Sequence, residues 1–188
     1  MSVRAIVVGA SAGGVQALSE ILPSLPADFS VPIMVVVHIP PRKDNALVDL
    51  FGRKCQLSVK EAEDKEPLQP GTIYFAPSNY HLLVETEATL ALSSDETVNH
   101  SRPAIDVLFE TAADAFGSEL VGIVLTGANQ DGAMGLKALS EAGGTAIVQD
   151  PSTAEVAAMP EAAIAACHSA HTMTLTEIQT TLLAMSER

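Results

Sequence analysis

Three side chains that together can carry out acyl transfer each follow a separate apolar run of this sequence. A serine hydroxyl is a weak nucleophile, a neutral imidazole can take its proton, and a carboxylate can orient that imidazole and stabilise its charged form. The sequence therefore predicts a nucleophile, a general base that later acts as an acid, and an orienting carboxylate. They are, in that order, Ser11 after residues 3–8, His38 after residues 33–37, and Asp131 after residues 121–125.

The serine lies in a glycine-rich turn that fits a nucleophile. Gly9-Ala10-Ser11-Ala12-Gly13 matches the GxSxG pattern of a sharp strand-to-helix turn, where helix N-terminal amides can bind an oxyanion. The alternative is that Ser11 merely caps the following helix. A dinucleotide site is disfavoured, because GxGxxG needs glycine at position 11 and the second strand ends in His38 rather than an acidic residue.

The other two side chains also have structural alternatives. His38 can simply hydrogen-bond a loop carbonyl, and Asp131, which precedes Gly132, can be the N-cap of the following helix. Asp150, which follows the strand 145–149, is the second candidate for the orienting carboxylate. His168 and His171 have no carboxylate or cysteine at metal-ligand spacing, so we predict no metal.

The spacing of apolar residues predicts the elements that position these side chains. Buried strands alternate with helical patterns, which indicates an α/β fold: a doubly wound, mainly parallel sheet with helices on both faces. The stretch 72–92 is typical of an antiparallel hairpin excursion. Residues at the carboxyl ends of parallel strands meet at one edge of such a sheet, which is where function gathers.

Length and charge exclude several classes of protein. The 188 residues are 47% hydrophobic and predict a single domain, 1–188, with a sizeable core. Ten basic against 23 acidic residues give a net charge of −13, so nucleic acid and acidic membranes are disfavoured partners. The apolar runs are too short to insert into a membrane. The two cysteines, Cys55 and Cys167, do not form a disulfide framework, and the expected location is the cytoplasm.

Six segments, in this order, resemble the catalytic domain of the CheB family, the chemotaxis receptor methylesterases. They are VVGASAGG, VVVHIPP, PGTIYFAP, RPAIDVLF, LTGANQDGA and QDPSTAEVAAMPEAAI. The resemblance covers residues 3 to 183 and implies Ser11, His38 and Asp131 as the catalytic triad. It also implies that glutamyl methyl esters on the cytoplasmic helices of chemoreceptors are hydrolysed to glutamate and methanol, without a cofactor. Members of the family also deamidate certain receptor glutamines.

The sequence departs from the family pattern at three places. Ala12 stands where many members have threonine, and the loop Ala128–Gln130 lacks a glycine of the family's LTGMGxDG segment. The resemblance still implies that the backbone at Ala12 and Ala128 contributes to the oxyanion hole. The receiver domain that gates the family's active site is expected to be absent. The chain is then either a stand-alone esterase or an excised piece, and a separate regulatory protein is a candidate partner.

A small basic rim could help to bind an acidic receptor helix. Arg42 and Lys43 follow the His38 loop, and Arg102 precedes Pro103; the alternative for all three is ordinary surface charge. The leading hypothesis is a receptor methylesterase. Two alternatives stay open: a binding or adaptor module that keeps the fold with weak turnover, and a serine esterase that acts on another methylated substrate.

Overall fold

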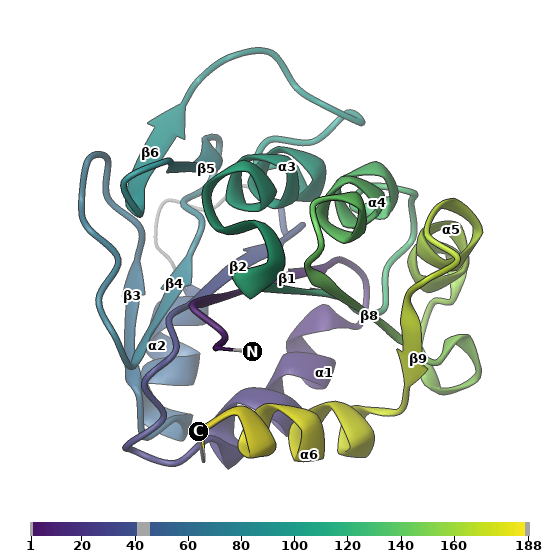
Figure 1. Cartoon of the computed structure of the whole chain (residues 1–188), viewed down its shortest axis with the longest axis horizontal. Helices are drawn as coiled ribbons and strands as arrows, with labels where there is room; N and C mark the ends of the chain where they lie inside the picture. Colours follow the sequence, from purple (N-terminus) through teal and green to yellow (C-terminus); the bar gives the residue numbers. More distant parts are fainter. Residues whose placement is uncertain (1, 41–45, 187–188) are drawn as a thin grey trace.

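The computed structural model describes residues 2–40 and 46–186 and shows a parallel sheet between two layers of helices (Figure 1). The described strands of this sheet run in the order β3-β4-β2-β1-β7-β8-β9, and every neighbouring pair is parallel. Their bounds are β1 Ala5–Ala10, β2 Ile33–Val37, β3 Ser58–Glu61, β4 Thr72–Phe75, β7 Leu120–Val124, β8 Thr145–Gln149 and β9 His171–Met173. The predicted fold class is confirmed.

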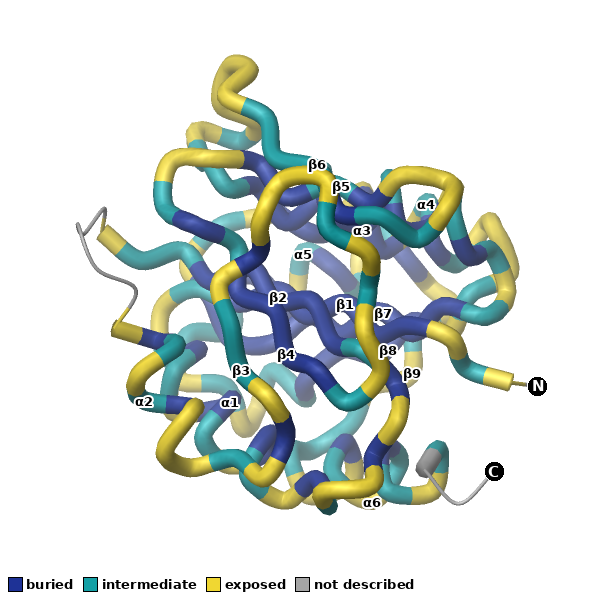
Figure 2. The backbone as a smooth tube through the Cα atoms, turned by 90° about the vertical axis from the view of Figure 1, so that its left-hand side faces the viewer, coloured by how far each residue is buried: buried dark blue, intermediate teal, exposed yellow. Residues whose placement is uncertain are grey.

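Helices cover both faces of the sheet, as predicted. On one face lie α3 Ile105–Phe116, α4 Ala133–Glu141 and α5 Ala158–Ala166; on the other lie α1 Gly14–Ile21, α2 Ala46–Lys54 and α6 Leu175–Ser186 (Figure 1). Successive strand residues face opposite layers, so Val7 packs into one apolar core and Ile6 and Val8 into the other. The central strands are therefore apolar on both faces, and Figure 2 shows them buried.

The antiparallel hairpin is confirmed, but it is shorter than predicted. It consists of β5 His81–Glu85 and β6 Thr89–Ser93, which pair with each other and pack on α3. Residues 72–75, which were expected to belong to it, form β4 of the main sheet, because β4 pairs in parallel with both β2 and β3.

The order of the strands places a crevice next to β1. From β1 the chain passes to β2 on one side and later returns to β7 on the other side. At such a point the connections leave neighbouring strands in opposite directions, which opens a crevice at the carboxyl ends of the strands. Ser11 follows β1, His38 follows β2 and Asp131 lies between β7 and α4, so the topology brings all three to this edge.

Candidate active site

Ser11 and His38 are neighbours across the ends of β1 and β2. Ala10, the last residue of β1, pairs with Val37, the last residue of β2. Ser11 and His38 directly follow these two residues. The His38 N–H donates to the Ala10 carbonyl at 3.0 Å, and the Ser11 N–H donates to the Thr126 carbonyl at 3.0 Å. The serine is thus held between the end of β2 and the loop that follows β7.

His38 and Asp131 form a close, buried pair. His38 Nε2 lies 2.8 Å from Asp131 Oδ2, and the two side chains are 13% and 0% exposed. Burial by itself would raise the pKa of Asp131. Hydrogen bonds from His38, from the backbone N–H groups of Ile105 and Asp106, and from Asn99 outweigh the burial and hold the pKa of Asp131 below its usual value. Asp131 is therefore an ionised carboxylate at neutral pH.

The interpretation of Asp131 as the N-cap of its own helix is wrong. Helix α4 begins after Gly132 and receives no side-chain cap from the preceding residues. The Asp131 carboxylate reaches across to α3 instead, where it accepts hydrogen bonds from the N–H groups of Ile105 at 2.6 Å and Asp106 at 3.1 Å. Asp131 is thus anchored at a helix N-terminus, where the helix dipole favours a negative charge.

The hydrogen bond to Asp131 determines which nitrogen of His38 is free to act as a base. Because an ionised carboxylate accepts at Nε2, that nitrogen carries the proton and the lone pair is on Nδ1. Asn129 Nδ2 faces Nδ1 at 3.4 Å, and the orientation of this amide is fixed because Asn129 Oδ1 accepts from the Asp131 N–H at 3.0 Å. In the neutral imidazole, this tautomer directs the Nδ1 lone pair away from Asp131, as a general base requires.

The serine is not used as a helix cap. The N-cap of α1 is Gly13, at φ +79°, and the N-terminus of this helix receives no side-chain hydrogen bond. Thr126 Oγ1 donates to the Ala12 carbonyl at 2.9 Å and so fixes the turn that carries Ser11. The capping alternative for Ser11 is therefore wrong, and its role as a nucleophile stays a prediction.

Ala12 and Ala128 have the exposure that an oxyanion site needs. Both residues are exposed, and neither backbone N–H donates a hydrogen bond to any residue that the structure describes. Ala12 follows Ser11 directly, and Ala128 lies in the same loop as Asp131. Their contribution to an oxyanion hole stays a prediction.

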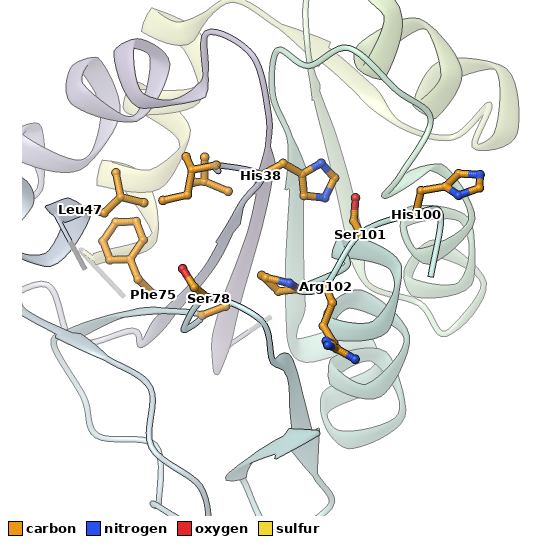
Figure 3. Close-up of a pocket in the computed structure, with 11 residues that line it drawn as sticks. His38, Leu47, Phe75, Ser78, His100, Ser101 and Arg102 are labelled. Atoms are coloured by element: carbon orange, nitrogen blue, oxygen red, sulfur yellow. The ribbon is translucent and has the colours of Figure 1, made fainter. Parts of the chain in front are cut away.

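A cleft of about 210 Å³ opens beside His38. In Figure 3, Leu47 and Phe75 lie at one end, Ser101 and His100 at the other, and His38 between them. The volume is below the roughly 300–1,000 Å³ of pockets for drug-sized ligands. The cleft therefore fits one side chain of a larger substrate better than a free ligand of that size.

The predicted basic rim is located only in part. Arg102 lines the cleft, but its side chain extends away from His38 (Figure 3). Its guanidinium donates to Asn79 Oδ1 at 2.7 and 3.2 Å and to the carbonyls of Ser94 and Asp95 at 2.9 Å each. These acceptors are neutral, so Arg102 holds the neighbouring loops together, and its charge forms no ion pair with any acidic residue in the described part of the chain. Arg42 and Lys43 lie outside the described residues.

Three polar side chains around Asp131 were missed by the sequence reasoning: Asn99, Asp106 and Asn129. The segment 99–103 was interpreted only as a loop, and Asp106 only as a helical residue; the polar asparagine before a helix was the available signal for Asn99. The interpretation of Asp150 as the orienting carboxylate is wrong, because its Oδ1 accepts hydrogen bonds from the N–H and the hydroxyl of Ser152. No group of three or more potential metal ligands occurs in residues 2–40 and 46–186.

The fold and the polar groups define a hydrolase-type site on an α/β sheet, and comparisons with known proteins give its family. The family model of the CheB methylesterase matches residues 6–182. A protein of Leptospira interrogans, provisionally assigned as a protein-glutamate methylesterase/protein-glutamine glutaminase, is 49% identical over 178 residues, which are 95% of this chain and 92% of that protein. A protein-glutamate methylesterase/protein-glutamine glutaminase of Carboxydothermus hydrogenoformans is 43% identical over 85% of this chain and 48% of its own length.

A solved structure agrees with these matches. The CheB methylesterase catalytic domain of Thermotoga maritima superposes with a TM-score of 0.91 at 33% identity and covers 98% of this chain and 100% of that one. The chain belongs to the CheB methylesterase family, a family of carboxylic ester hydrolases. The resemblance seen in the sequence is confirmed. The chain spans most of the Leptospira protein but about half the length of several other relatives.

Proposed function

We propose that residues 1–188 act as one catalytic domain that hydrolyses glutamyl methyl esters on the cytoplasmic helices of chemoreceptors, with Ser11, His38 and Asp131 as the triad. The observation that carries this proposal is the buried His38–Asp131 hydrogen bond beside Ser11 at the edge of a CheB-type sheet. Because the substrate helices are cytoplasmic, we place the enzyme in the cytoplasm. No helix in the described part of the chain is long and apolar enough to cross a membrane.

The proposed first step forms an acyl-enzyme. Ser11 Oγ attacks the ester carbonyl carbon while its proton passes to His38 Nδ1, the nitrogen that faces away from Asp131. The N–H groups of Ala12 and Ala128 donate hydrogen bonds to the carbonyl oxygen and stabilise the negative charge that develops on it. When the tetrahedral intermediate collapses, His38 returns the proton to the methoxy oxygen and methanol leaves.

The proposed second step regenerates the enzyme. Water attacks the glutamyl-serine ester while His38 takes one of its protons, and the acyl bond to Ser11 Oγ breaks as His38 gives that proton back. The products are a glutamate side chain and free Ser11. The glutaminase activity in the relatives' names follows the same course, with ammonia leaving in place of methanol, and we propose it for this chain as a second activity.

The first experiment is methanol release from membranes that carry methyl-labelled receptors, with the wild type compared with Ser11→Ala. We expect Ser11→Ala to lower the rate on the order of 10⁴-fold while the protein stays folded. Release with an unchanged rate in a folded Ser11→Ala protein would overturn the assignment of the nucleophile.

Labelling of Ser11 by a fluorophosphonate separates the remaining outcomes. An activated serine reacts with this probe. A labelled protein that releases no methanol from receptors is a competent esterase for another methylated substrate, or it needs an activating partner. A protein that is neither labelled nor active fits a binding or adaptor module of the same fold.

A further inference from the structure

A second buried carboxylate, that of Asp106, lies behind the carboxylate that binds His38. Asp106 is on the first turn of α3 and is 7% exposed. Its Oδ1 accepts from the N–H groups of Gly132 at 3.0 Å and Gly135 at 2.7 Å, and its Oδ2 accepts from Asn99 Nδ2 at 2.8 Å. All three partners are donors, as an ionised carboxylate requires.

Asn99 joins the two carboxylates directly. Its Nδ2 lies 2.8 Å from Asp106 Oδ2 and 2.8 Å from Asp131 Oδ1, so one amide hydrogen points to each acid. Its backbone has φ +52°, in the left-handed region that asparagine tolerates better than most residues. The left-handed backbone and the two hydrogen bonds together indicate that this bridge is a specific feature of the loop.

The surroundings of this pair of acids are poor in positive charge. Glu110 lies one turn along α3, and Lys137 on α4 is directed to Glu141 at 3.9 Å. Among the described residues, no lysine or arginine forms an ion pair with either buried acid, and His38 is the basic side chain that contacts Asp131. Burial raises the pKa of Asp106, against the hydrogen bonds from Gly135 and Asn99, and the charge of Asp131 raises it further.

We propose that Asp106 is a positioning residue for the hydrolysis proposed above: through Asn99 it fixes the Asp131 carboxylate, and its negative charge stabilises the positive charge that His38 acquires from Ser11. The inference rests on that proposed function. Two buried negative charges, one in contact with the imidazole and one behind it, favour the protonated form of the imidazole more than one charge does, because the interior screens charges weakly. The same two charges would be unfavourable if the imidazole stayed neutral throughout.

The test is the titration of His38 in the full chain, followed by the NMR signal of its ring. The signal is assigned by its loss in His38→Gln. In Asp106→Asn, which keeps an oxygen for the Gly132 and Gly135 amides, we expect the midpoint to fall by on the order of half to one pH unit. The acid limb of the pH–rate profile for methanol release should move in the same direction, and kcat should fall more than KM changes.

Two further variants make the test specific. Asp114→Asn removes one charge from an exposed position of the same helix and should leave the midpoint where the wild type has it. Asn99→Ala keeps both acids but removes one of the two hydrogen bonds that Asp131 Oδ1 accepts, so the negative charge facing His38 grows and the midpoint should rise. An unchanged midpoint in Asp106→Asn, or in Asn99→Ala if Asp106→Asn does not fold, would overturn the proposal.

The titration needs no turnover and therefore separates this inference from the proposed function. If the midpoints move as expected but the wild type cleaves no ester, the proposed function fails while the link between Asp106 and His38 stands. If the wild type cleaves receptor esters and the midpoints do not move, Asp106 has only a structural role.

Discussion

Asp131 and Asp106 exchange helix caps: each carboxylate accepts hydrogen bonds from the N-terminus of the other's helix. Asp131, which precedes α4, binds the first N–H groups of α3, and Asp106, on α3, binds the N–H groups of Gly132 and Gly135 at the start of α4. Each carboxylate satisfies N–H groups that a helix leaves unpaired at its start. The carboxylate that orients His38 is therefore also part of the packing of α3 against α4.

This double role of Asp131 makes a pH-dependent prediction for stability. Because the pKa of Asp131 is lowered in the folded state, its ionisation stabilises the fold above the unfolded value near pH 4, and this contribution is lost as pH falls through the lower folded pKa. We expect Asp131→Asn to lower the free energy of unfolding by about 1–3 kcal/mol at pH 7 and by less at pH 3. Urea unfolding at both pH values measures this difference.

The control for this prediction is Asp114→Asn, which removes an exposed carboxylate from α3. It should follow the wild type at both pH values. A deficit in Asp131→Asn that is the same at pH 3 and pH 7 would show that the lost stability does not depend on the ionised carboxylate.

The close approach of α3 and α4 gives a second prediction. A Cβ at Gly135 would lie 2.7 Å from Phe109 Cβ and 3.0 Å from the Asp106 Cα, so Gly135→Ala must push the helices apart. We expect a loss of about 1–3 kcal/mol in the free energy of unfolding and weaker esterase activity. Gly52→Ala is the matched control: Gly52 lies in α2, and apart from its neighbours in the chain and the backbone of its own helix no atom lies within 4 Å of the added Cβ. It should be neutral or stabilising by up to about 1 kcal/mol, because alanine favours helix.

The sheet could be predicted closely from the sequence. The strands β2 and β8 were predicted with the bounds that the structure shows, because strands buried on both faces carry runs of apolar residues: all five residues of β2 and the middle three of β8 are apolar. The predicted hairpin was wrong at its N-terminal end. The local pattern of residues 72–75 predicts a strand, but it does not show which other strand this one pairs with. Pairing of β4 with β2 depends on contacts far apart in the sequence.

For the site, the sequence predicted three individual side chains and their roles but not the hydrogen bonds around them. Strand ends and GxSxG pointed to Ser11 and His38, but a helix-start pattern made Asp131 look like a cap for its own helix. The exchange of caps with Asp106 joins residues 25 positions apart in the chain, and no local signal reports it. Asn99 and Asn129 act through their amide groups at distances that only the folded loops establish.

Arg102 gives a prediction about the walls of the cleft. Its guanidinium donates hydrogen bonds to the Asn79 side chain and to the carbonyls of Ser94 and Asp95, and so ties these segments to the residue that lines the cleft. We expect Arg102→Gln to loosen these loops and to raise KM several-fold for receptor and small esters alike. Arg42→Glu, by contrast, should weaken turnover of receptors more than that of a small ester, because it acts through charge on the acidic substrate. Steady-state kinetics with both substrates measure the two effects.

The two arginine predictions are separable because their patterns differ. Equal effects of Arg42→Glu on both substrates would contradict a charged rim at that position. If Arg102→Gln affected the receptor substrate alone, the unpaired charge of Arg102 and not its clamp would be the property that matters.

Asn129 gives the last prediction, which concerns His38 Nδ1, the nitrogen that takes the serine proton in the proposed mechanism. Its amide N–H faces His38 Nδ1 at 3.4 Å and cannot turn away without losing the bond from the Asp131 N–H. This donor competes with Ser11 for the Nδ1 lone pair and opposes a proton there. Asn129→Ala should therefore raise kcat about 2- to 10-fold, the value of one weak hydrogen bond, with KM little changed. It should also move the acid limb of the pH–rate profile to higher pH.

Gln130→Ala is the matched control for this change, because it shortens an exposed side chain in the same loop without touching His38. It should leave kcat and the acid limb at their wild-type values. A fall of kcat in Asn129→Ala alone would mean that the amide orients the imidazole for catalysis more than it blocks the lone pair. In that case Asn129 would belong with Asp131 among the groups that hold His38 in its reactive position.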